Sequence, residues 1–227
     1  MTPLLDDVDK PDIDFQMKPT LALSLLIGTL LLFNISSSFA QDMHAKEYGT
    51  KSEQLRSGMH KLWEDHVTWT RNVILNIIDD LPGTNEAVAR LLKNQDDIGN
   101  AIKPIYGDAA GNELTRLLRE HITQAADLLK AAKTNNKVAF DDMNKKWLAN
   151  ADEISVFLSK ANPNWKLDDM KKMMHEHLRL TTDEAVARIK KDYDADVKAY
   201  DKVHEEILVM ADMLTDGIVK QHAEKFK

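Results

Sequence analysis

From about Ser52 onward, apolar residues recur every three or four positions along most of the chain. That period places them on one face of an α-helix, whereas half-buried β-strands alternate apolar and polar residues at every second position. No stretch of the sequence shows a convincing alternating pattern. We therefore predict an all-α fold, a bundle of four to six helices that forms a single domain over residues 52–227.

Prolines, glycines and short polar runs divide this pattern into helical segments. Pro82, Pro104 and Pro163 lie between strongly periodic stretches, as helix-breaking residues do. The predicted helices span residues 52–80, 85–103, 109–133, 138–160 and 167–180, followed by a long last helix that almost reaches the C-terminus. Thr181 and Glu184 have the spacing of a capping box, which predicts that the last helix begins there.

A weak internal repeat relates two parts of the chain. A single fixed shift aligns Asn94 with Asn150 and His121 with His177, within similar local sequences. Helical sequences also resemble one another by chance, so the repeat supports two interpretations, a duplicated helix pair or a coincidence.

The segment 1–40 has the pattern of a cleavable signal peptide. An apolar run over residues 21–33 is followed by the small residues that a signal peptidase requires, which predicts cleavage between Ala40 and Gln41. The run is shorter than the roughly 20 apolar residues of a membrane span, so we expect no stable membrane anchor after cleavage; an uncleaved anchor is the alternative. The residues before Met17 are acidic, which makes Met17 a candidate start. We expect a flexible N-terminus over residues 41–51 and a periplasmic or secreted protein.

The composition restricts the classes of partner and of chemistry. Charged residues make up 30% of the chain and hydrophobic residues 43%, as in soluble globular proteins. The segment 1–40 holds two Lys and five Asp, so the remainder has 28 basic and 32 acidic side chains, and its net charge of −4 does not favour nucleic acid as a partner. The absence of cysteine excludes disulfides and thiolate ligands. No nucleophile or phosphate-loop motif indicates catalysis.

Six polar residues fall on the apolar faces of the predicted helices, where an unpaired polar group costs a few kcal/mol. They are His66, Asn94, His121, Asn150, His177 and Asp196. Helical bundles bind divalent zinc, copper or iron with imidazole and carboxylate groups from facing helices. The predicted metal ligands are His66, His121, His177 and Asp196. The residues predicted to orient them or to add ligands are Asn94, Asp97, Asp127, Asn150 and Glu153.

Two other interpretations of these polar groups stay open. In one, they form hydrogen-bonded layers that fix the register of the helices and bind nothing. In the other, Met170, Met173 and Met174 bind soft Cu(I) with help from His175 or His177, although methionines at helical spacing usually fill the core.

Three segments of the sequence carry a resemblance to a known family. They are residues 62–71, which read Leu-Trp-Glu-Asp-His-Val-Thr-Trp-Thr-Arg, together with residues 150–154 and 210–218. Over about residues 55–221 the chain resembles a family of exported bacterial helical-bundle proteins. Some members are labelled glycosyltransferase or acetylglutamate kinase, and both activities imply a nucleotide-binding α/β domain that the helical pattern does not predict. The resemblance implies recurring motifs that contain His66, Trp69, Arg71, Asn150, Asp152 and Glu153.

The leading functional hypothesis is an exported, non-enzymatic bundle that binds a metal ion or a small ligand through its buried His, Asn and Asp cluster. The alternative is a structural or protein-interaction component of the cell envelope, in which the polar layer only fixes helix register. An enzyme with an unrecognised site is the third hypothesis. The sequence does not indicate an oligomeric state.

Overall fold

The computed structural model describes residues 49–227, which fold into six α-helices and a short 3-10 helix. They are α2 (Lys51–Ile78), α3 (Thr84–Tyr106), α4 (Asp108–Lys133), α5 (Lys137–Ala161), α6 (Leu167–Ile189), α7 (Tyr193–Gln221) and η1 (Ala223–Lys225). Residues 49–227 contain no β-strand, so the predicted all-α bundle is confirmed. The predictions made for residues 1–48, namely the signal peptide, the start at Met17 and the cleavage before Gln41, lie outside the described residues.

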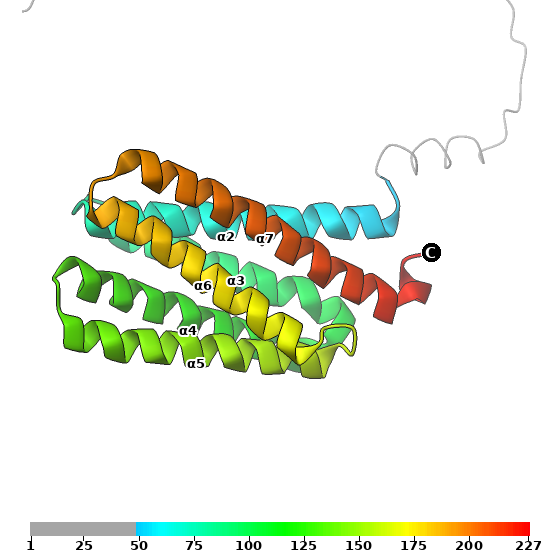
Figure 1. Cartoon of the computed structure of the whole chain (residues 1–227). Coiled ribbons are helices and arrows are strands. Elements are labelled where there is room, and N and C mark those ends of the chain that lie inside the picture. The colour runs from blue at the N-terminus through cyan, green and yellow to red at the C-terminus, as the bar shows by residue number, and fades with distance from the viewer. Residues whose placement is uncertain (1–48) are drawn as a thin grey trace, which may run out of the picture. The chain divides into compact units, whose positions relative to one another are not determined.

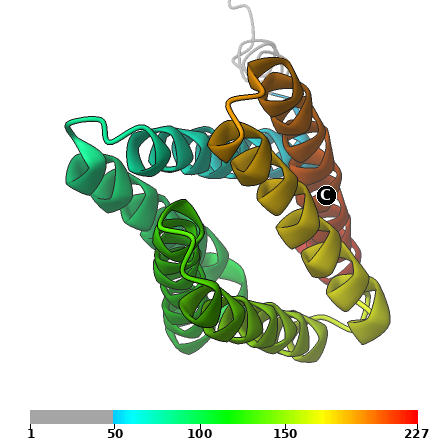
Figure 2. The same cartoon turned by 60° about the vertical axis from the view of Figure 1, so that its left-hand side comes forward.

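The helices form three hairpins that close into a ring. The hairpins are α2–α3, α4–α5 and α6–α7, and between them α3 packs on α4, α5 on α6 and α7 on α2. Figure 1 shows the six helices side by side, and Figure 2 shows the three pairs around the interior, with α6 and α7 along its right side. Every helix therefore turns its apolar face towards one shared core. No helix within residues 49–227 is both long and apolar enough to cross a membrane.

The same turn ends the first helix of each hairpin. Asp80, Asn135 and Lys191 have left-handed backbone conformations, with φ angles of 54°, 52° and 59°. The following backbone N–H groups bond back across the turn, in the pairs Leu81 to Asn76, Asn136 to Ala131 and Asp192 to Ala187. Such bonds satisfy the carbonyl groups that the end of a helix leaves free. The three turns recur at nearly equal spacing along the chain, which indicates three copies of one hairpin.

Buried side chains repeat with the same spacing and meet at the centre of the bundle. Trp63, Leu118 and Met174 lie at equivalent positions on the first helices of the three hairpins, and all line one interior cavity. The second helices contribute an equivalent set, Ile98, Ile154 and Met210. The predicted duplication is therefore part of a triplication. A search at one fixed shift aligns the second helices of all three copies but misses the first helix of the first copy, because the spacing between the first helices of the first two copies is one residue shorter than between those of the last two.

The end of α3 differs from the prediction. The helix was predicted to end at about Lys103, through Pro104 and the turn at residues 106–108, but α3 continues through Pro104 to Tyr106. A proline lacks only its own N–H and clashes only with the turn before it, so a helix that is close to its end can continue past it for a few residues. The helix stops at Gly107, whose φ of 86° is accessible to glycine.

The predicted start of the last helix at Thr181 is wrong. Thr181 lies inside α6, and its hydroxyl donates to the carbonyl oxygen of His177 at 2.9 Å instead of capping a helix. The chain turns later, at Lys191, and Asp192 caps α7 by accepting a hydrogen bond from the backbone N–H of Ala195 at 3.1 Å. A capping-box spacing inside a continuous apolar stripe is therefore weaker evidence than the stripe itself.

Candidate functional site

Three histidines occupy equivalent positions on the first helices of the three hairpins. His66 on α2, His121 on α4 and His177 on α6 are 3%, 3% and 5% exposed and line the same cavity. The rings of His66 and His177 lie closest together, with centroids 5.7 Å apart and planes inclined by 38°. The structure thus brings the three predicted histidines to one place in the core.

Each histidine is held by a residue 29 positions later, on the second helix of its own hairpin. The bond always involves the Nδ1 atom of the imidazole. The partners are Gln95 at 3.2 Å, Asn150 at 2.9 Å and Glu206 at 2.9 Å. The repeat therefore sets the position of each ring, and the partner residue determines which hydrogen bond the ring makes at Nδ1.

Both ring nitrogens of His121 have protein partners. Nδ1 donates to the Asn150 side-chain oxygen at 2.9 Å, and Nε2 accepts from the indole N–H of Trp147 at 3.2 Å. Burial, with a smaller contribution from the charge of His177, lowers the pKa of His121 to about 3. His121 is therefore a neutral, fully hydrogen-bonded core residue, and it could bind a metal only by giving up one of these bonds.

His177 has the arrangement of a histidine that is oriented to bind a ligand. Nδ1 lies 2.9 Å from Oε2 of Glu206, whose side chain is 14% exposed. The other carboxylate oxygen of Glu206 is buried and has no hydrogen-bond partner among residues 49–227. No side chain in that range bonds to Nε2 of His177. A carboxylate on one nitrogen of a histidine commonly orients the other nitrogen towards a metal ion.

His66 is intermediate between these two cases. The side-chain nitrogen of Gln95 lies 3.2 Å from its Nδ1 and also donates to the carbonyl of Leu91 at 2.9 Å and to Asn94 at 3.0 Å. An amide has two N–H groups for these three acceptors, so the bond to His66 is shared. Burial, together with the charges of His177 and His121, lowers the pKa of His66 well below its usual value. The ring is therefore neutral at pH 7. Because Nδ1 accepts from Gln95, the ring proton lies on Nε2, and it must move to Nδ1 before Nε2 can bind a metal ion. No residue in the described range bonds to this Nε2.

The cavity beside the imidazoles is small and mostly apolar. It has a volume of about 40 Å³, counted as the space open to the centre of a water molecule. One buried water needs roughly 10–15 Å³ on that measure, and a cavity that binds benzene has about 150 Å³. The wall includes residues from all six helices, among them Met59, Met174 and Met210. The space therefore suits an ion or a ligand of a few atoms.

Asp196, the fourth predicted metal ligand, is buried but lies in a separate ionic cluster. It accepts hydrogen bonds from Arg71 at 2.9 and 3.2 Å and from Arg188 at 3.3 Å. Arg71 also donates to Glu184 at 2.6 Å, and burial raises the pKa of Glu184 to about 7 although Arg71 lowers it. Two guanidinium groups already neutralise Asp196, and it does not line the histidine cavity.

Of the predicted orienting residues, only the two asparagines are buried beside the histidine layer. Asn150 bonds to His121, and Asn94 donates to the carbonyl of Leu62 at 2.9 Å. The three acidic residues do not contact the histidines: Asp97 pairs with Lys93, Asp127 with Lys130, and Glu153 lies outside the core. Within residues 49–227, no group of three or more His, Asp or Glu side chains lies close enough together to hold a metal ion.

Sequence reasoning missed three residues that determine the state of the imidazoles, namely Gln95, Trp147 and Glu206. The signal that finds Gln95 and Glu206 is their distance of 29 residues from a histidine, the same as that between His121 and Asn150. No comparable spacing indicates Trp147, because it belongs to one hairpin alone.

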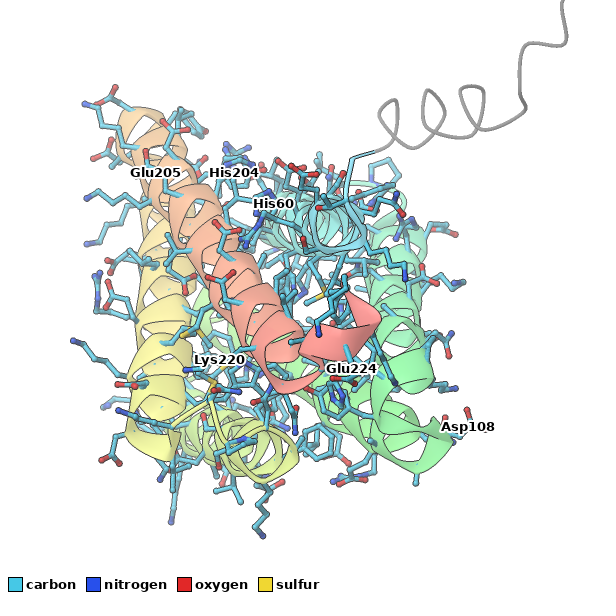
Figure 3. The ribbon with its side chains drawn as sticks, turned by 90° about the vertical axis from the view of Figure 1, so that its right-hand side faces the viewer. His60, Asp108, His204, Glu205, Lys220 and Glu224 are labelled. Carbon is cyan, nitrogen blue, oxygen red and sulfur yellow. The ribbon has the colours of Figure 1, made fainter. Side chains whose placement is uncertain are left out.

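Other histidines lie at the surface between α2 and α7 and are separate from this cavity. His60 is hydrogen-bonded to Asp212 at 2.7 Å, and His204 lies 3.5 Å from the carboxylate of Glu64. Figure 3 labels both histidines on the outer side of the bundle, where α7 passes α2. These contacts connect two helices and do not form a pocket.

Comparisons with protein-family models, with curated proteins and with solved structures found no match for this chain. The resemblance to exported bacterial helical-bundle proteins therefore stays a prediction.

Proposed function

We propose that this protein is an exported binding protein that holds one metal ion, or a ligand of a few atoms, between His66 and His177 without catalysing a reaction. The observation that carries the proposal is the state of these two rings. Both line one cavity, and neither Nε2 atom has a hydrogen-bond partner within residues 49–227. Polar atoms of buried side chains normally have a partner, so two imidazole nitrogens without one favour a ligand beside them.

The separation of the two rings is compatible with a shared metal ion. When two imidazoles bind the same ion through Nε2, at about 2.0–2.1 Å each, their ring centroids lie roughly 5–6 Å apart. The centroids of His66 and His177 are 5.7 Å apart.

A second candidate function, a purely structural polar layer, is favoured by one specific observation. His121 has a protein partner at each ring nitrogen. If the whole layer worked in this way, the protein would use it to fix helix register and bind nothing. The two candidates therefore differ in what they predict for His177 and agree for His121.

Matched substitutions at equivalent positions separate the two functions. We would purify the wild-type chain and the variants His177→Gln and His121→Gln, confirm their helicity, and measure bound metal and the thermal shift with Zn²⁺, Fe²⁺ and Cu(I). Gln can replace the hydrogen bonds of imidazole but is a poor metal ligand. We expect one ion per chain in the wild type and in His121→Gln. In His177→Gln the affinity should fall by more than the roughly 10–100-fold that loss of an orienting residue costs.

The opposite results have equally definite meanings. If the wild type binds none of these ions, the proposal of a bound metal ion fails and the structural function is favoured. If His121→Gln and His177→Gln lose binding equally, the distinction between the two rings fails.

A further inference from the structure

We infer that the ion is monovalent copper, Cu(I), bound by the imidazoles of His66 and His177 and by the thioether of Met174. This inference rests on the binding function proposed above and names its ligand. It follows from the charge of the cavity wall, from the softness of the donor atoms and from their positions on the helices.

The charge around the cavity favours a monovalent ion. No Asp or Glu of the described residues lines the cavity, and the carboxylate of Glu206 is joined to it only through the ring of His177. The cost of moving an ion into a medium of low dielectric constant rises with the square of its charge, so a divalent ion costs about four times as much as a monovalent one. One carboxylate and one Cu(I) ion together have no net charge.

The donor atoms on the cavity wall are soft. Met59, Met174 and Met210 are 4%, 5% and 1% exposed, and all three line the cavity. Thioether donors favour Cu(I) and imidazole suits copper as well as zinc and iron, whereas Ca²⁺, Mg²⁺ and Mn²⁺ prefer carboxylate, carbonyl and water oxygens. Residues 49–227 do not form a three-ligand set of His, Asp and Glu, which a harder ion such as iron would favour.

Met174 is the methionine best placed to complete the site. It precedes His177 by three residues on α6, and side chains three positions apart lie on the same face of a helix. The equivalent positions in the other hairpins are Trp63 and Leu118, which have no donor for a metal. The hairpin that contains the carboxylate-bound histidine therefore also contains the methionine.

A competition titration under anaerobic conditions tests the inference. The wild-type chain is titrated with Cu(I) in the presence of a coloured Cu(I) chelator, and loss of the chelator complex reports transfer to the protein. We expect one Cu(I) per chain. The variant Met174→Leu, which removes the sulfur and preserves the size, should bind at least about tenfold more weakly.

Met170→Leu is the matched control. Met170 is 1% exposed and lies one turn earlier on α6, but it does not line the cavity. Its substitution should leave the Cu(I) affinity unchanged within about twofold. Far-ultraviolet circular dichroism and thermal denaturation of both variants establish that they are equally folded.

Each remaining outcome overturns a defined part of the account. Binding of Zn²⁺ that depends on His177, with no binding of Cu(I), overturns the copper inference and leaves the binding function in place. Binding of neither ion overturns both. Equal Cu(I) affinity of Met174→Leu and Met170→Leu overturns the role of the thioether.

Discussion

His121 and His177 lie at the same position in two successive copies of one hairpin, and their neighbours differ. At His121, Asn150 and Trp147 engage both ring nitrogens. At His177, a carboxylate engages Nδ1, and Val203 stands at the position that Trp147 has in the preceding copy. Because valine has no N–H donor in its side chain, Nε2 of His177 lacks the bond that Nε2 of His121 has. The repeated backbone sets where each imidazole lies, and two side chains decide whether it can bind anything.

The largest expected effect is a loss of stability when His177 is replaced. The variant His177→Leu leaves Glu206 as a poorly solvated carboxylate without its imidazole partner, which should lower the free energy of unfolding by about 3 kcal/mol. The same change at His121 leaves only neutral groups unpaired and should cost roughly 2 kcal/mol. Urea denaturation at pH 7 measures both values.

A double variant shows whether the carboxylate is the cause. In His177→Leu/Glu206→Leu the unpaired charge is gone, so most of the lost stability should return. If the double variant is as unstable as His177→Leu, the loss comes from packing and the difference between the two histidines is not electrostatic.

The next effect concerns pH and sharpens the description of His121 as a neutral core residue. Its pKa is about 3 when folded, against an ordinary value of 6.5, so between these values the unfolded chain binds more protons than the folded chain. Stability must therefore fall as the pH is lowered below 6.5, by roughly 2 kcal/mol between pH 7 and pH 5 from this residue alone.

Urea denaturation of the wild type and of His121→Gln at pH 7 and pH 5 measures this contribution. The variant should lose about 2 kcal/mol less than the wild type over this interval. Parallel behaviour of the wild type and His121→Gln would contradict the pKa assigned to the folded state.

The smallest expected effect is a change in ion selectivity, when Gln95, the partner of His66, is replaced by the type of residue that pairs with His177. Gln95→Glu adds a second carboxylate beside the site, which favours an ion of charge two over an ion of charge one. We expect the ratio of the Zn²⁺ affinity to the Cu(I) affinity to rise roughly tenfold. Gln54→Glu adds the same charge at an exposed position of α2 and should leave the ratio unchanged. An unchanged ratio in both variants would show that Gln95 does not influence the ion.

The helical bundle was predictable because its apolar stripes have the period of a helix over almost every segment. The predictions failed at Pro104 and Thr181, where a local rule was given more weight than the stripe on both sides of it. The first helix of the first hairpin also escaped detection, because the step from His66 to His121 is one residue shorter than the step from His121 to His177. One deleted residue is enough to hide a repeated helix from a search at a fixed shift.

Burial of the polar residues could be predicted, but their partners could not. His66 and Asp196 both lie on apolar faces and both are buried. Yet Asp196 bonds to Arg71, 125 residues away, because a long arginine side chain can reach it from another helix. The apolar stripe of a helix predicts that a polar residue within it is buried. It does not predict which residue of another helix will be its partner. Glu206 was missed for the same reason, since it resembles any other acidic residue at the edge of the stripe on α7.

The most direct test of the account is to locate the ion in crystals. Crystals of the wild-type chain grown anaerobically with Cu(I) would be measured on both sides of the copper absorption edge. The account predicts one anomalous peak in the central cavity, in contact with Nε2 of His66 and of His177 and with the sulfur of Met174, while Trp147 still donates to His121. A peak bound to His121, or copper found only at surface histidines such as His60, would contradict it.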